Sequence, residues 1–258
     1  MFKNSDTILT VGSISGDSLI KGLLTVAVPG RPLSLDALQD MGVSAYLAAK
    51  YARSGWLVRL GPGLYRLPSP PLDRDQSLLV LQQRVDGLHM GSRTALAWQG
   101  IRHNLDAVER LTLWGDRPGP LPTWFTDAFA TRYRSVRLFT ADAADLAVFT
   151  PPALTPGVRV STRERALIEL LRDAGQGQDL DEATHLFEAT SGLRTSVLGD
   201  LLSRCVSVKA VRLVLLWGGR VGNVDVDALR SDYTLPTGST SRWIGTMDDG
   251  STLVLPPC

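Results

Sequence analysis

The chain has 258 residues, enough for one large domain or two smaller ones with buried cores. Its 44% hydrophobic and 21% charged residues are typical of an ordinary globular protein. The net charge of only +1 excludes a protein that attracts nucleic acid through the field of the whole molecule.

The charge is nevertheless uneven along the chain. Up to Leu67 there are seven Lys or Arg residues against four Asp residues, a net charge of +3. A basic first domain on a neutral body fits a reader of specific DNA sites better than a bulk polyanion binder.

The N-terminal segment and the cysteines indicate a cytoplasmic protein. Residues 1–17 lack the apolar core of a signal peptide, and the apolar run 19–27 is too short to span a bilayer. Cys205 and Cys258 provide no disulfide framework, which is typical of a reducing compartment.

The first 67 residues have the pattern of three helices followed by a β-hairpin. Ser34 and Ser44 are suited to cap the second and third helices, and Gly42 and Gly55 to end them. The predicted elements are helices at 19–27, 35–40 and 45–54, and strands at 56–60 and 64–67 around a Gly-Pro-Gly turn. This order predicts a winged helix-turn-helix, a fold that commonly places one helix in the major groove of DNA.

The third predicted helix has one inward stripe and one cationic stripe. Tyr46, Lys50 and Arg53 share the cationic stripe, which suits phosphates and base edges. On the hairpin, Arg59 and Arg66 lie on opposite arms, where they can flank a minor groove or a row of phosphates. The candidate DNA contacts are Ser44, Tyr46, Lys50, Arg53, Arg59 and Arg66. The alternative is that this is a solvated basic face on an ordinary small domain that does not bind DNA. Helix-turn-helix units also serve as protein-docking modules.

The proline-rich segment 68–71 predicts a boundary between a DNA-binding domain at 1–70 and a larger domain at 71–258. The second domain mixes helices and strands, so the predicted class is α+β. Its predicted helices are 76–85, 93–100 (capped by Ser92), 163–173 (opened by a Ser161–Glu164 capping box), 181–190, 194–204, 206–217 and 226–230. Its predicted strands are 109–114, 135–139, 158–160 and two short strands around the turn 248–250.

Two groups of cations in the second domain are candidate partner contacts. Arg93 can meet a partner, or it can pair with a neighbouring carboxylate near its helix terminus. Lys209 and Arg212 are three residues apart, which predicts a basic patch that can meet an acidic protein surface or a phosphate chain. The alternative is a solvated helix face.

Five segments make the chain resemble the AbiEi antitoxins of type IV toxin–antitoxin systems, in the variety with a winged-helix N-terminus. They are YLAAKYARSGWLVRLGPGLYRL, HMGSRTALAWQGIRHNL, LTLWGDRPGPLPTWF, VSTRERALIELL and LLSRCVSVKAVRLVLLWGGRVG. Each alone has little specificity, but all five occur in the family's order and extend over nearly the whole chain. One departure is Gly91-Ser92, where family members commonly have two glycines.

The resemblance implies a two-part protein. Its winged helix is expected to bind double-stranded DNA at inverted repeats upstream of its own operon and to repress it. By position, Ser44, Tyr46, Lys50 and Arg53 fall on the recognition helix, and Arg59 and Arg66 fall on the wing. The second domain is expected to oppose a nucleotidyltransferase-like toxin; a plain transcriptional regulator without a toxin partner is the alternative.

The residues indicate no catalysis. Gly91-Ser92 and Asp225-Val226-Asp227 superficially resemble nucleotidyltransferase motifs, but they are more than a hundred residues apart and the acidic pair leads into a helix. The three histidines lack metal-ligand spacing, and no phosphate loop or dinucleotide fingerprint is present. We therefore predict no catalytic residue, no metal and no cofactor.

Overall fold

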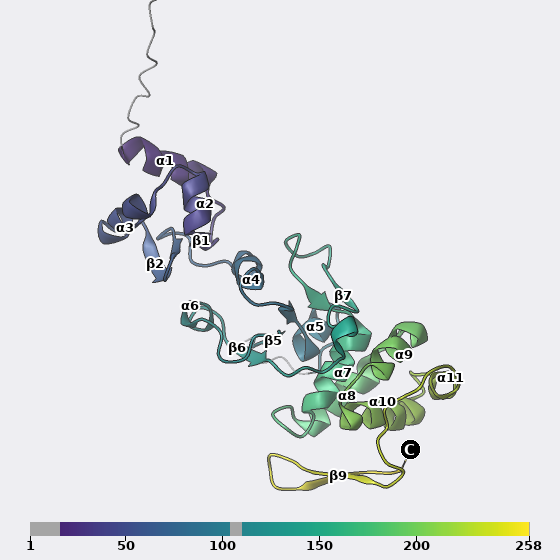
Figure 1. The fold of residues 1–258 in the computed structure, drawn as a ribbon. Coiled ribbons are helices and arrows are strands. Elements are labelled where there is room, and N and C mark those ends of the chain that lie inside the picture. The colour runs from purple at the N-terminus through teal and green to yellow at the C-terminus, as the bar shows by residue number, and fades with distance from the viewer. Residues whose placement is uncertain (1–15, 104–109, 258) are drawn as a thin grey trace, which may run out of the picture. The chain divides into compact units, whose positions relative to one another are not determined.

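The computed structural model describes residues 16–103 and 110–257, and the side chains from residue 19 onward. The chain divides into two compact units, Met1–Ser77 and Leu78–Cys258 (Figure 1). None of the described helices is long and apolar enough to cross a membrane.

The first unit contains three helices and a three-stranded sheet. Its elements are α1 (Gly16–Val26), β1 (Leu33–Ser34), α2 (Leu35–Asp40), α3 (Ala45–Arg53), β2 (Val58–Gly61) and β3 (Leu64–Arg66). The antiparallel sheet has the order β1-β3-β2. Three helices followed by a β-hairpin are the elements that the sequence predicted, in the same order; the two-residue β1 was not predicted.

Local signals explain the two short helices. Ser34 Oγ accepts a hydrogen bond from Ala37 N at 3.1 Å, so it caps α2 as predicted. Gly42 and Gly55 follow the helices with φ of +80° and +82°, a backbone conformation that favours glycine. The inner faces meet in one apolar core, which contains Ile20, Leu23, Ala27, Leu33, Leu38, Val43, Ala48, Tyr51, Leu57, Tyr65 and Leu67.

The second unit is built around a five-stranded mixed sheet of order β6-β5-β4-β8-β7. The strands of this sheet are β4 (His89–Met90), β5 (Leu111–Trp114), β6 (Thr131–Arg134), β7 (Val148–Phe149) and β8 (Val160–Ser161). β5 pairs with β6 and β4 with β8 in parallel, whereas β4–β5 and β7–β8 are antiparallel. A separate hairpin joins β9 (Trp243–Thr246) to β10 (Thr252–Leu255).

The helices of this unit include two that are buried around most of their surface, α7 and α10. The helices are α4 (Arg74–Gln82, which crosses the unit boundary), α5 (Ser92–Trp98), α6 (Thr123–Thr126), a 3-10 turn (Ala141–Ala143), α7 (Arg163–Asp173), α8 (Leu180–Ala189), α9 (Thr195–Ser203), α10 (Val208–Val221) and α11 (Val226–Asp232). The mixture of helices and strands in two units confirms the α+β class.

Several predicted details of the second unit are wrong. The strand predicted at 135–139 is instead β6, four residues earlier. Thr162, not Ser161, is the N-cap of α7, because the Ser161 hydroxyl donates to a buried carboxylate instead. The predicted strand 109–114 is β5, although residue 109 lies outside the described residues. Of the two cysteines, Cys205 is buried and forms no disulfide, and Cys258 lies outside the described residues.

Candidate nucleic-acid interface

The outward side of α3 carries the predicted DNA contacts. We call Tyr46, Ala49, Lys50 and Arg53 the α3 outer face; all four residues are exposed, and Tyr46 has 72% of its surface accessible. Ser44 is also exposed, and its Oγ caps the helix by accepting from Leu47 N at 3.3 Å. One helix thus presents a tyrosine and two cations beside a small residue that permits close approach.

The inner side of α3 fixes this orientation. Ala48 is fully buried and Tyr51 is 6% exposed, and both belong to the core of the first unit. Rotating the helix to hide Lys50 or Arg53 would expose these two residues. Neither cation has an ion-pair partner among the described residues, and α3 contains no acidic residue.

The two wing arginines have different environments. Arg59 is exposed and pairs across the ladder with Tyr65, so it lies on the face of the hairpin opposite to Arg66, the next residue along β3. The Arg66 guanidinium donates to Leu67 O at 2.9 Å and to Pro68 O at 2.8 Å. Arg59 Nε also donates to a backbone carbonyl, Gly61 O, at 3.4 Å. Because the two arginines lie on opposite faces of the hairpin, they do not both face one groove. Arg59 is more exposed than Arg66 and is therefore the better candidate for a phosphate contact.

Trp56 is a residue of this region that the sequence reasoning missed. It lies between α3 and β2, and half of its surface is exposed. Its backbone is fixed by a hydrogen bond from its N–H to Tyr51 O at 2.9 Å. An exposed tryptophan three residues beyond Arg53 adds a second flat aromatic side chain near the cationic helix. The sequence signal for its exposure was its position directly after Gly55, the glycine that follows α3.

The predicted basic patch of Lys209 and Arg212 does not exist at the surface. Lys209 is 6% exposed and donates to Ala174 O at 2.9 Å; burial, followed by the nearby Arg172, lowers its pKa to about 8. Arg212 is 2% exposed. Its guanidinium binds four carbonyl oxygens of the C-terminal segment, those of Thr237, Ser239, Ser241 and Pro256. Both residues therefore hold the interior together and are not partner contacts.

Arg93 pairs with a neighbouring carboxylate, which was the alternative to a partner contact. Its Nη1 lies 3.4 Å from Glu182 Oε1, across from α5 to α8. The side chain remains 29% exposed and lines a small cavity.

A buried carboxylate, Glu169, organises the centre of the second unit. It accepts hydrogen bonds from His89 Nε2 at 2.9 Å, Ser92 N at 2.9 Å, Ser161 Oγ at 3.0 Å and Arg165 Nε at 2.9 Å. Burial alone raises the pKa of this carboxyl, but His89 and Arg165 outweigh burial and hold the pKa below its usual range. One side chain thereby ties together β4, β8, α5 and α7.

This network explains the Gly91-Ser92 motif. Ser92 is not the N-cap of α5 as predicted; Gly91 is, and Ser92 is the first helical residue with φ +48°. A Cβ on Gly91 would overlap Glu169 Oε2 and lie 2.6 Å from Trp114 Cδ1. The glycine thus permits close approach. Ser92 has a positive φ, a backbone conformation that glycine adopts without strain.

Comparisons with known proteins agree with these features. The family model described as "Transcriptional regulator, AbiEi antitoxin N-terminal domain" matches residues 16–107, and that described as "Transcriptional regulator, AbiEi antitoxin, Type IV TA system" matches residues 108–254. No curated protein matches. The crystal structure of the RV2827C protein from Mycobacterium tuberculosis is similar in fold, with a TM-score of 0.56 and 17% identity over 89% of this chain and 88% of that one. The chain belongs to the AbiEi antitoxin family of transcriptional regulators from type IV toxin–antitoxin systems.

Proposed function

We propose that the first unit binds double-stranded DNA at inverted repeats upstream of its own operon and represses transcription. The α3 outer face carries this proposal, because it is a cationic and aromatic surface on the second helix of a helix-turn-helix. In this role Lys50 and Arg53 contact phosphates, Tyr46 contacts base edges or sugars, and Arg59 adds a phosphate contact from the wing. The Ser44 hydroxyl caps α3 and can still donate its hydrogen to a phosphate oxygen.

The second unit is proposed to oppose a nucleotidyltransferase-like toxin encoded beside this chain. The family description supports an antitoxin role. With Lys209 and Arg212 buried, no basic patch on α10 supports contact with an acidic toxin surface. Neutralisation is therefore expected to be separable from DNA binding by substitutions confined to the α3 outer face.

The test uses the full chain and the DNA segment directly upstream of its own gene. Specific retardation of that segment, but not of a shuffled segment of equal length and composition, supports repression through the first unit. A promoter–reporter fusion should be silenced by the wild-type protein and released by the Lys50→Ala/Arg53→Ala double variant. The same variant should still restore growth of cells that express the neighbouring toxin.

Two other experimental outcomes would contradict the proposal, and each would favour a different function. Absence of specific binding even at low salt, with an intact fold, favours a protein-docking role for the first unit. Specific binding without any rescue from the neighbouring gene product favours a plain transcriptional regulator.

A further inference from the structure

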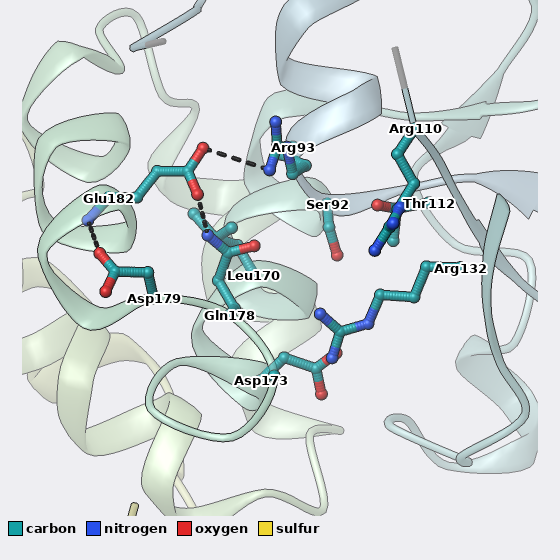
Figure 2. Close-up of a pocket in the computed structure, with 11 residues that line it drawn as sticks. Ser92, Arg93, Arg110, Thr112, Arg132, Leu170, Asp173, Gln178, Asp179 and Glu182 are labelled. Atoms are coloured by element: carbon teal, nitrogen blue, oxygen red, sulfur yellow. Dashed lines mark hydrogen bonds and ion pairs between the residues drawn. The ribbon is translucent and has the colours of Figure 1, made fainter. Parts of the chain in front are cut away.

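A small cavity in the second unit is lined by arginines, carboxylates and hydroxyl groups (Figure 2). Its volume is about 120 Å³, room for about four water molecules at roughly 30 Å³ each. Figure 2 shows Arg110 and Arg132 entering from the strand side, and Arg93 and Glu182 from the helix side. None of these side chains belongs to the proposed DNA-binding face.

The sheet brings two of the cations together. β5 and β6 are parallel neighbours, and Thr112 pairs in register with Arg132. Arg110 directly precedes β5, and it lines the cavity together with Thr112 and Arg132. Arg110 is exposed and has no ion-pair partner among the described residues.

Two buried hydroxyls also face the cavity. Ser92 is 4% exposed and Thr112 is 5% exposed, and both line it. Ser92 Oγ accepts a hydrogen bond from Trp114 Nε1 at 3.1 Å, so its own hydrogen remains to be donated. In the described part of the chain neither hydroxyl has an acceptor. Two hydroxyl donors thus line the cavity without an acceptor within hydrogen-bond distance among the described residues.

The carboxylates around the cavity are already engaged. Asp173 is shared by Arg134, by Arg132 at 3.5 Å and by Arg172 at 3.8 Å. Asp179 caps α8 by accepting from Glu182 N at 2.7 Å. Three arginines and three carboxylates line the cavity, and Arg110 is the lining arginine without an ion pair among the described residues.

Glu182 completes the set of engaged acids, since it accepts from Gln178 Nε2 at 2.7 Å and pairs with Arg93. The loop after α7 also closes tightly on the cavity. Gly177 has φ +79°, and a Cβ there would overlap the Arg132 guanidinium. Burial and the neighbouring Arg134 and Arg110 lower the pKa of Arg132 against the opposing effect of Asp173. The cavity is thus a recess with closely packed walls, in which Arg110 is left without an ion pair among the described residues.

We propose that this cavity binds the phosphate group of a small molecule. Arg110, which has no ion pair among the described residues, and Arg132, whose contact with Asp173 is 3.5 Å long, pair with its oxygens. The Ser92 and Thr112 hydroxyls also donate to these oxygens, since charge-assisted hydrogen bonds are the strong ones in such sites. The small volume favours a terminal phosphate over the backbone of a polymer. The ligand is free phosphate or the phosphate of a mononucleotide.

The test is calorimetric titration of the full-length protein with inorganic phosphate, AMP and adenosine, at constant ionic strength set with chloride. Saturable binding of phosphate and AMP, with none of adenosine, is expected. AMP binding more than about tenfold tighter than phosphate would identify a nucleotide ligand, and equal affinities would identify free phosphate.

Three variants make the site falsifiable. Arg110→Gln should weaken binding about tenfold or more, and Thr112→Val about fivefold, without changing the thermal midpoint of the unliganded protein. Arg117→Gln, an exposed arginine outside the cavity, is the matched control and should bind as the wild type does. Absence of saturable binding, unchanged binding in both cavity variants, or displacement of AMP by an oligonucleotide without terminal phosphates would overturn the proposal.

Discussion

Replacing Lys50 and Arg53 with alanine tests the α3 outer face most directly. Neither side chain has an ion-pair partner among the described residues, so their loss removes no such pair within the protein. Alanine also has the highest helix propensity. The free energy of unfolding should therefore change by less than about 0.5 kcal/mol, as for most surface substitutions.

The effect on DNA binding follows from counterion release. Each phosphate contact contributes about 0.9 to the slope of log affinity against log salt, so the double variant should lose about 1.8 from that slope. When salt rises from about 50 to about 200 mM, the affinity gap between wild type and variant should shrink by about twelvefold.

Fluorescence anisotropy with a labelled operator fragment, at four or more salt concentrations, measures both slopes. The matched control is Arg220→Ala/Arg230→Ala, which removes the same charge from exposed positions in the second unit and should keep the wild-type slope. Equal slopes for wild type and the α3 variant would refute the assignment of these two residues to phosphates.

Three further outcomes are expected. Gly91→Ala should lower the free energy of unfolding by at least about 2 kcal/mol in denaturant titrations, because its Cβ overlaps the Glu169 carboxylate, whereas Gly219→Ala, with open space around it, should not. The Glu164 pKa is lowered from 4.5 to about 2, as its ion pair outweighs burial, so it stabilises the fold above pH 4.5 and this contribution disappears as pH falls towards 2; Glu164→Gln should flatten that part of the stability–pH curve. Trp56→Ala should weaken operator binding in the anisotropy assay while leaving the salt slope unchanged, because no charge is lost.

A specific result would contradict each of these three predictions. Equal stabilities of the two glycine variants would show that the region around Glu169 relaxes freely. An unchanged acid profile in Glu164→Gln would mean that other carboxylates govern that range. A Trp56 variant with wild-type affinity would place this side chain outside the interface.

The elements with local signals were predictable from the sequence. Ser34 and Ser44 cap their helices by hydrogen bonds that span only three residues, and Gly42 and Gly55 end them through their own backbone conformation. The outward direction of Tyr46 follows from helix periodicity alone. These features need no knowledge of distant parts of the chain.

The errors concern residues whose partners are distant in the sequence. Arg212 reads as a surface cation because its four acceptor carbonyls lie 25 to 44 residues further along the chain. Ser92 reads as a cap because nothing near it indicates that Glu169, 77 residues away, takes its N–H. Periodicity cannot separate a buried, fully satisfied polar group from a solvated one.

The position of Glu169 in the chain also has a consequence for synthesis on the ribosome. The first unit ends at Ser77, but the carboxylate that joins β4, β8, α5 and α7 emerges about 90 residues later. At common translation rates this interval is roughly 5–20 s, and domains generally fold in the order of their synthesis. A growing polypeptide therefore completes the first unit before Glu169, the hydrogen-bond partner of His89 and Ser92, has been synthesised.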